Sequence, residues 1–474
     1  MPAIVTLGAM SAKAFGFTGS TGAQGKYFIY MSGYICGLPP TPGQHAQFTY
    51  GGYVDACNNI YNVGTANFSG ICNGYTGGFG TVVKSCGTEK AQLQFERPST
   101  GAGCSATASI IYKSPTTVGG NTFVAGTYVQ NNQLALFKFS ASGCLTNQKS
   151  LSTFNCCNVA KLVNSGSRLY TFWGNCVTRI QSYNTCLTST GNLFVKGVDQ
   201  ACPCGSAGNL NLSSVSNVLS CKVFTYGQGL TFTGCTPSCA LSISQFCLSA
   251  APPTYVSTYQ SNQGGILRGN NIIQDSTYFY FLYTIATTLA ITKFNKSSYA
   301  RSWTQSFLTN STGQTPACGQ ITTDNIGNVY AAVRQRDSSY NGITIFKLNS
   351  SGTTQWIRRV LYNPSNNSLI TSLNLLNIDQ LGDLVLNATS FNNSNTQRYT
   401  LVLRIPTDGS HTGSYTVGSY GTVSYQAYTQ SCSILSTPTL TSKTFQTLSQ
   451  SLNPSNPTLN SKINSTIPKT TLII

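Results

Sequence analysis

The sequence predicts an all-β protein built from repeated units, on the basis of its composition and of a strand-and-turn pattern that recurs along the chain. Only 8% of the 474 residues are charged, while 26 Tyr, 23 Phe and 45 Gly are present. Aromatic and β-branched residues favour half-buried strands, Gly and Asn favour the turns between them, and the residue types of helical surfaces are scarce. The chain is long enough for one large all-β domain or for two to three ordinary ones.

The first repeated feature is a strand that ends in a basic residue and is followed by a hydrophobic residue and a polar turn. Its copies occupy residues 135–143, 290–298, 344–352 and 401–409. Lys293, Lys347 and Arg404 share one register in these copies, at separations of 54 and 57 residues. This spacing is typical of a four-stranded propeller blade with long loops.

Two further features share this period. The pattern Asp-x-x-Gly, followed by a polar and an apolar residue, recurs after 55 residues in two pairs, Asp324 with Gly327 and Asp379 with Gly382. Trp303 and Trp356 are 53 residues apart and follow Lys293 and Lys347 by ten and nine residues. We predict that each Asp accepts backbone hydrogen bonds in a turn, that each Gly supplies a permissive backbone, and that each Trp belongs to the next strand.

Together these features resemble the β-propeller repeats of bacterial and phage proteins, in which D-x-x-G-N-x-Y precedes a strand, K-L-D-x-x-G and an aromatic residue. The resemblance is good over 275–420 and weaker before it. It implies a β-propeller over 27–432, with Cys-rich, divergent blades at 27–250 and regular blades at 251–432. Dividing this span by a period of about 50 residues predicts about seven four-stranded blades.

Both ends of the chain differ from this body. Residues 1–26 are rich in Gly, Ala and Ser, and we expect them to be ordered only against a neighbour, as an anchoring segment. Residues 433–474 form a Ser/Thr/Asn/Pro tract with almost no charge, which cannot build a core of its own. This extended tail is either disordered or runs along another subunit and adds strands to it.

The charge balance favours an anionic partner over a membrane. Lys and Arg number 27 against 10 Asp and Glu, a formal net charge of +17, which attracts polyanions. The basic residues are scattered, with no run longer than Arg358-Arg359 and no nucleic-acid motif, so an acidic glycan or an unspecialised basic surface is favoured over nucleic acid. The sequence contains no apolar run of membrane-spanning length and no secretory signal, which predicts assembly in a cytoplasm.

The cysteines separate the two halves of the chain, because 16 of the 18 lie between Cys36 and Cys247. The close pairs are Cys156-Cys157, Cys202-Pro-Cys204 and Cys235-x-x-x-Cys239. A zinc site usually needs two ligand pairs, and His45 and His411, the only histidines, are far from these pairs in sequence. Disulfides formed in an oxidising medium, buried free thiols and a metal site all remain open, and the first is favoured.

The residues needed for catalysis are scarce. The ten carboxylates are Asp55, Glu89, Glu96, Asp199, Asp275, Asp324, Asp337, Asp379, Asp383 and Asp408. Asp324, Asp379 and Asp408 fall in repeat turns, which explains them without catalysis. The least explained carboxylates are Asp55, Glu89 and Glu96 in the divergent part. We expect His411 to be a solvated turn residue, and we predict no enzyme activity, no catalytic or metal-binding residues and no cofactor.

The remaining surface is rich in Tyr, Asn, Ser, Thr and Gln, which suits sugar recognition or packing against other chains, or simply solvates a β surface. The segment 7–17 resembles short G-A-x-S-A-x-[AG]-F-G-F stretches in tail and fibre proteins of tailed bacteriophages. That resemblance implies a structural virion component, a tail fibre, spike, baseplate or neck appendage, that contacts other virion proteins and copies of itself and binds host surface polysaccharide. The alternatives are a secreted cell-surface lectin or adhesin and a polysaccharide-degrading tailspike.

Overall fold

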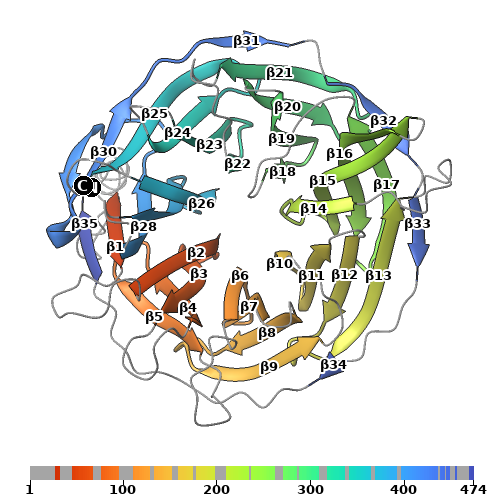
Figure 1. The fold of residues 1–474 in the computed structure, drawn as a ribbon, viewed down its shortest axis with the longest axis horizontal. Helices are drawn as coiled ribbons and strands as arrows, with labels where there is room; N and C mark the ends of the chain where they lie inside the picture. The colour runs from red at the N-terminus through yellow and green to blue at the C-terminus, as the bar shows by residue number, and fades with distance from the viewer. Residues whose placement is uncertain are drawn as a thin grey trace, which may run out of the picture.

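We describe the protein from a computed structural model, which is drawn in Figure 1. The residues described are 27–32, 45–67, 76–95, 110–128, 133–151, 159–174, 178–197, 210–233, 236–261, 271–285, 288–308, 318–336, 341–363, 369–391, 397–435, 438–443, 445–448, 454–455 and 469–473. These residues form strands and turns, with one short 3₁₀ helix, η2 (Gly418–Tyr420). The predicted all-β class is confirmed. No helix in this part of the chain is long and apolar enough to span a membrane.

Seven four-stranded antiparallel blades surround a central axis, as predicted (Figure 1). Blade 1 consists of β2 (His45–Val54), β3 (Ile60–Asn67), β4 (Thr76–Val83) and β5 (Glu89–Phe95). Blade 2 consists of β6 (Ile110–Val118), β7 (Asn121–Tyr128), β8 (Gln133–Phe139) and β9 (Leu145–Leu151). Blade 3 consists of β10 (Val159–Ser165), β11 (Arg168–Gly174), β12 (Thr178–Tyr183) and β13 (Ser189–Gly197). Blade 4 consists of β14 (Leu210–Val215), β15 (Lys222–Thr233), β16 (Thr236–Cys247) and β17 (Thr254–Ser261).

The last three blades contain the regular repeats. Blade 5 consists of β18 (Ile272–Gln274), β19 (Tyr278–Ile285), β20 (Thr288–Asn295) and β21 (Arg301–Leu308). Blade 6 consists of β22 (Gly319–Thr323), β23 (Val329–Arg336), β24 (Asn341–Leu348) and β25 (Thr354–Asn363). Blade 7 takes its first three strands from β26 (Leu369–Ile378), β27 (Leu384–Phe391) and β28 (Gln397–Ile405). Its fourth strand is β1 (Phe28–Ser32), which pairs antiparallel with β28 and closes the ring with the N-terminal end of the described chain.

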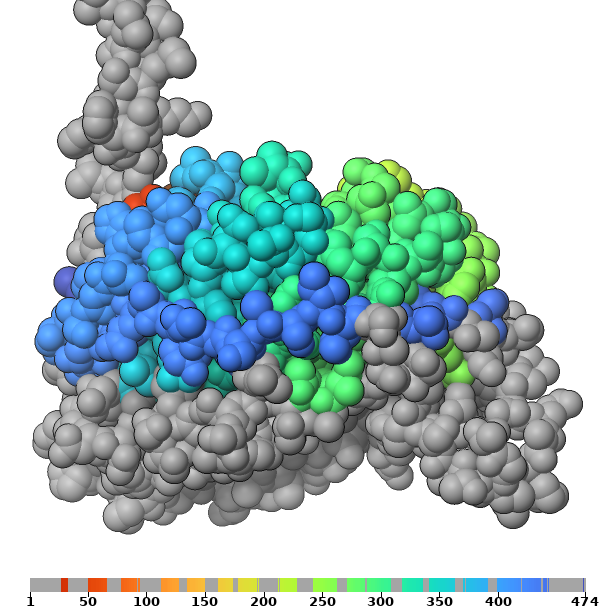
Figure 2. All heavy atoms as spheres, turned by 90° about the horizontal axis from the view of Figure 1, so that it is seen from above, coloured from red at the N-terminus to blue at the C-terminus, as the bar shows by residue number. Residues whose placement is uncertain are grey.

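A C-terminal belt of short strands, from β30 to β35, lies around the outside of the ring in the reverse order of the blades (Figures 1 and 2). Its strands are β30 (Thr422–Ala427) on blade 6, β31 (Cys432–Ile434) on blade 5, β32 (Leu440–Lys443) on blade 4, β33 (Phe445–Leu448) on blade 3, β34 (Pro454–Ser455) on blade 2 and β35 (Lys469–Ile473) on β1 of blade 7. The short strand β29 (Gly413–Thr416) leads into β30 and pairs with it.

The belt differs from the predicted tail. We expected residues 433–474 either to be disordered or to add strands to another subunit, whereas their described strands pair with this chain's own blades. The fourth strand of a blade leaves one edge of backbone donors and acceptors open, and an extended segment of almost any polar sequence satisfies such an edge. The predicted anchoring segment, residues 1–26, lies outside the described residues.

The hydrophobic core consists of side chains packed between neighbouring blades. One cluster joins blades 5 and 6 through Leu289, Phe307 and Phe346, and a larger one joins blades 6 and 7. Within each blade, the turn between the first two strands and the turn between the last two strands lie at the same face of the ring, because strand direction alternates. We call these the first turn and the third turn. In blade 7, whose last two strands, β28 and β1, are not consecutive in the chain, the third turn is the turn that follows β28.

Candidate functional site

The repeat residues meet where one blade packs against the next. Lys293 Nζ and Trp303 Nε1 of blade 5 both donate to the carbonyl oxygen of Ser350, in the third turn of blade 6, at 3.0 Å each. Lys293 and Trp303 are cross-strand partners on β20 and β21, so both side chains reach the same acceptor. We call this arrangement, a donor pair on one blade and a turn carbonyl on the next, a seam clasp.

The seam between blades 6 and 7 repeats the clasp. Lys347 Nζ and Trp356 Nε1 donate to the carbonyl oxygen of Thr407 at 3.0 and 3.2 Å. The Lys347 ammonium lies 5.3 Å from the ring centroid of Tyr330, and at the preceding seam Lys293 lies 3.9 Å from that of Tyr278. Such cation–π contacts compensate part of the cost of removing an ammonium from water.

A glycine in the third turn makes room for each tryptophan. Gly352 has φ 89° and a Cβ at this position would lie 2.7 Å from Trp303 Cδ2. Gly409 has φ 77° and the same relation to Trp356, at 3.0 Å. Both the backbone conformation and the close indole ring therefore require glycine here.

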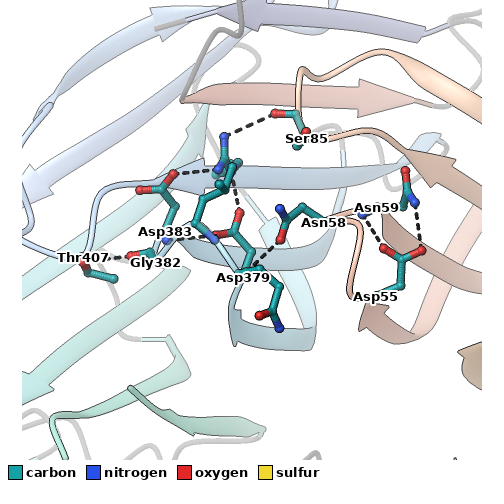
Figure 3. A network of polar contacts seen from close by, with 11 residues as sticks. Asp55, Asn58, Asn59, Ser85, Asp379, Gly382, Asp383 and Thr407 are labelled. Carbon is teal, nitrogen blue, oxygen red and sulfur yellow. Dashed lines mark hydrogen bonds and ion pairs between the residues drawn. The ribbon is translucent and has the colours of Figure 1, made fainter. Parts of the chain in front are cut away.

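The seam between blades 7 and 1 closes the ring, and there Arg404 takes the place of the lysine. Figure 3 shows its partners Ser85, Asp379 and Asp383. Arg404 Nη1 donates to the carbonyl oxygen of Ser85, in the third turn of blade 1, at 3.3 Å. Its Nε and Nη2 each lie 2.7 Å from a carboxylate oxygen, of Asp379 and Asp383 respectively, and Arg404 is 1% exposed. The cross-strand partner of Arg404 is Phe28 on β1, the position that tryptophan occupies at the two preceding seams.

The first turns show what the repeated aspartates do. Asp324 Oδ1 accepts hydrogen bonds from the backbone N–H groups of Ile326 and Asn328, at 3.1 and 2.8 Å. Asp379 accepts from Leu381 and Asp383 in the same way, and also holds Arg404. Gly327 and Gly382 follow these aspartates with φ of 84° and 83°.

The carboxylates that the sequence left unexplained have structural contacts in the described residues. Asp55 is the first-turn aspartate of blade 1 and lies beside Asn59 (Figure 3). It accepts hydrogen bonds from the backbone N–H groups of Cys57 and Asn59. Glu89 accepts a hydrogen bond from the Tyr30 hydroxyl at 3.0 Å. Asp408 lies, as predicted, in a repeat turn, the one that follows β28, where it accepts a hydrogen bond from the Ser410 backbone.

All carboxylates in the described residues lie in or beside first and third turns, at one face of the ring. Glu96, Asp199 and Asp337 lie outside the described residues. The described first-turn aspartates bond their own turns, as at Asp324 and Asp379. The two carboxylates held against Arg404, those of Asp379 and Asp383, are bridged by its guanidinium.

The histidines take no part in a catalytic arrangement among the described contacts. His411 is exposed in its turn at φ 59°, and its ring lies 4.8 Å from that of Tyr27. Its backbone carbonyl accepts a hydrogen bond from the Tyr415 hydroxyl. The side chain of His45 is not described.

The described cysteines include one disulfide pair and several residues that form no disulfide. Cys221 and Cys247 form a disulfide that joins the two turns of blade 4. The other described cysteines, which are outside this disulfide, are Cys57, Cys86, Cys144, Cys186, Cys318 and Cys432. The described residues contain no cluster of His, Cys, Asp and Glu side chains that could hold a metal ion. Of the predicted close pairs, the side chains of Cys156, Cys157, Cys202, Cys204, Cys235 and Cys239 are not described.

The innermost strands of blades 2 and 3, β6 and β10, lie near the axis (Figure 1) and carry Lys113 and Lys161. The Lys113 ammonium lies 4.7 Å from the ring centroid of Tyr50 on β2, beside a β-bulge in each strand. Lys161 Nζ donates to the carbonyl oxygen of Val215 on β14 at 2.8 Å, and burial lowers its pKa to about 8. Lys113 is therefore the partly exposed cation, whereas the Lys161 ammonium is buried at the seam between blades 3 and 4.

A hollow of about 270 Å³ lies at the outer rim of the seam between blades 5 and 6. Its walls are Trp303 and Gln305 of β21, residues 351–354 of blade 6 and residues 432–434 of the belt. The residues therefore come from three segments far apart in sequence. Sequence reasoning identified Trp303 as a repeat residue but missed Gln305 and Cys432. The only available signal was the register, which places Gln305 two residues after the repeated tryptophan on the same face of its strand.

Comparison with known proteins bears on the fold alone. No protein-family model matches the sequence, and no curated protein matches it. Among solved structures, Drosophila Semaphorin 2a is similar with a TM-score of 0.45 and 10% identity, over 82% of this chain and 76% of that one. Drosophila Plexin A, solved in complex with Semaphorin 1b, has a TM-score of 0.39 and 9% identity, over 81% of this chain and 94% of that one. The periplasmic gluconolactonase PpgL of Pseudomonas aeruginosa has a TM-score of 0.35 and 14% identity, over 69% of this chain and 94% of that one. The similar propellers thus include an enzyme and non-enzymes.

Proposed function

We propose that this chain is a binding and structural propeller of a phage virion, in a tail fibre, spike, baseplate or neck appendage, and that it attaches to host surface glycans. The observation that carries the proposal is that two parts of the chain secure the ring, namely strand β1 and the C-terminal belt. The N-terminal strand β1 lies between β28 and β35, and belt strands cover the outer edges of blades 2 to 6. A propeller with its edges covered resists unwanted strand pairing and opening, which suits a particle exposed outside a cell.

Two further observations support binding over hydrolysis. The described carboxylates are engaged in turns or in ion pairs with Arg404, as at Asp324 and Asp379. The inner rim carries the partly exposed Lys113, which favours an anionic polymer. Both agree with a protein that holds a charged glycan without cleaving it.

The test combines binding and cleavage in one preparation. Purified protein is mixed with the capsular or surface polysaccharide of a candidate host, and co-sedimentation and newly formed reducing or unsaturated ends are measured. We expect saturable co-sedimentation that weakens with added salt, and no new ends. New ends that form in proportion to protein would replace the proposal by a polysaccharide-degrading tailspike, and absence of binding to the polysaccharide of every permissive host would reject attachment.

A secreted lectin or adhesin is the second candidate, and the disulfide between Cys221 and Cys247 favours it, because disulfides persist in oxidising compartments. Electron microscopy and peptide mass spectrometry of purified particles distinguish the two locations. Density for a propeller on a particle appendage supports the virion, and recovery of the chain only from a cell surface or medium supports the adhesin.

A further inference from the structure

Each of three seams has an aromatic residue in its clasp, Trp303, Trp356 or Phe28. The residue two positions after it makes different contacts at each seam. At the seam between blades 6 and 7 this position is Arg358, whose Nε donates to the carbonyl oxygen of Gly409 at 2.8 Å and whose guanidinium lies 5.5 Å from the Trp356 ring centroid. At the ring-closing seam it is Tyr30, which bonds Glu89. In both places a long side chain crosses the seam and reaches the next blade.

At the seam between blades 5 and 6 the same position is Gln305, which is too short to cross. Gln305 is 6% exposed and lines the hollow, yet no residue that the structure describes hydrogen-bonds its side-chain amide. The amide atoms themselves are not fully enclosed, so they face the hollow and can bond water or a ligand that enters it.

The lining defines the chemistry of that ligand. Trp303 supplies an aromatic wall, the Gln305 amide supplies a donor and an acceptor, and Ser351, Thr353 and Thr354 supply hydroxyl groups. The lining contains no Lys, Arg, Asp or Glu. An aromatic surface with amide and hydroxyl groups and without charge matches a neutral polyhydroxylated ring better than an anion.

We propose that this hollow is a subsite for one neutral hexose unit of a glycan, read by Gln305 and packed beside Trp303. The inference rests on the proposed attachment to glycans and assigns it a place on the outer rim, away from the lysines of the inner rim. A single small subsite is expected to bind weakly, in the millimolar range, and to contribute through many units of a polymer.

The exposed thiol of Cys432 provides a local readout, because it lines the hollow while Cys57 and Cys186 are exposed elsewhere. The native full-length protein is treated with iodoacetamide, and the alkylation rate of each thiol is followed by peptide mass spectrometry. The probes are the methyl glycosides of glucose, galactose, mannose and N-acetylglucosamine, with glucuronic acid as the anionic comparison. We expect at least one neutral glycoside to slow alkylation of Cys432 several-fold, with unchanged rates at Cys57 and Cys186.

The variant Gln305→Arg tests the assignment without removing a packing group. It reproduces the Arg358 arrangement, so the new guanidinium is expected to reach the Gly352 carbonyl and fill the hollow. Gln380→Arg is the matched control, since it adds the same charge at an exposed first turn of blade 7. We expect Gln305→Arg to lose the protection of Cys432 and Gln380→Arg to retain it, with both variants folded by circular dichroism.

The possible outcomes separate the two proposals. If the wild-type chain co-sediments with host polysaccharide but no neutral glycoside protects Cys432, the subsite is wrong and the attachment stands. If glucuronic acid protects as well as the neutral sugars, the neutral assignment is wrong. If a neutral glycoside protects Cys432 while no host polysaccharide binds, the subsite stands and attachment to the host fails.

Discussion

The seam between blades 6 and 7 and the seam between blades 7 and 1 perform the same task with different chemistry. The first joins blades that are consecutive in the chain, and it uses Lys347 and Trp356 against a neutral carbonyl. The second joins blade 7 to blade 1, and it uses Arg404 against the Ser85 carbonyl, with Phe28 of β1 as the aromatic partner. The geometry is kept while the residue types change, and the cation of the closing seam is also anchored within its own blade by the carboxylates of Asp379 and Asp383.

The largest difference between these seams is expected for loss of the cation. Arg404→Met leaves Asp379 and Asp383 without their buried partner, and we expect it to lower the free energy of unfolding by about 3–5 kcal/mol. Lys347→Met removes a bond to a neutral carbonyl, and about 1–2 kcal/mol is expected. Urea unfolding followed by tryptophan fluorescence measures both. Equal losses would contradict the idea that charge distinguishes the closing seam.

The contribution of the tryptophan to the clasp is tested by substituting the glycine that packs against it. Gly352→Ala strains a positive φ and places a methyl group against Trp303, and about 2–4 kcal/mol of destabilisation is expected. Gly382→Ala is the matched control, because its φ is also positive but a Cβ there has no atom within 4 Å. Only the backbone cost of about 1–2 kcal/mol is expected for it. Similar losses in the two variants would show that the indole contact adds nothing.

The buried lysines at the seams are expected to make the free energy of unfolding depend on pH, in a range where arginine stays protonated. Burial lowers the pKa of Lys161, at the seam between blades 3 and 4, to about 8, and burial also lowers that of Lys293. The unfolded chain therefore binds more protons than the folded one above this pKa, so stability rises as pH increases. From Lys161 alone we expect a gain of about 2 kcal/mol between about pH 7 and 9.5.

Urea midpoints across this pH range measure the effect, with Lys161→Met to remove it and the exposed Lys84→Met as a control. An unchanged gain in Lys161→Met would exclude Lys161 as its source. Above about pH 10 the trend is expected to reverse, because burial raises the pKa of Tyr30, Tyr183 and Tyr362 and the unfolded chain then loses protons first.

The smallest effect is expected at Tyr30, the residue of β1 whose side chain crosses the closing seam. Tyr30→Phe removes the hydrogen bond to Glu89 but keeps the packed ring, and about 1 kcal/mol of destabilisation is expected. A double-mutant cycle with Glu89→Gln separates this bond from the Arg404 network. A coupling energy near zero would place the strength of the closing seam in Arg404 alone.

The sequence predicted the propeller because blades 5 to 7 repeat their turn and clasp residues at one spacing. It could not predict that Phe28 completes the third clasp, since Phe28 and Arg404 are neighbours only after the ring has closed. The belt was missed for a related reason: its strands pair through backbone groups and therefore leave little pattern in the side chains. Gln305 was missed because its role is visible only when it is compared with Arg358, the residue at the equivalent position of the next seam. Trp303 was identified because tryptophan is rare in this chain and rarely recurs at one spacing by chance.

The path of the belt also constrains how a nascent chain matures. Strand β1 is synthesised before its two neighbours, β28 and β35, and has to wait for both of them. A chain that stops before residue 469 therefore displays at least one unpaired edge on β1, however well its middle blades have folded. Pairing of β35 with β1 thus reports that synthesis has passed the last blade and the belt.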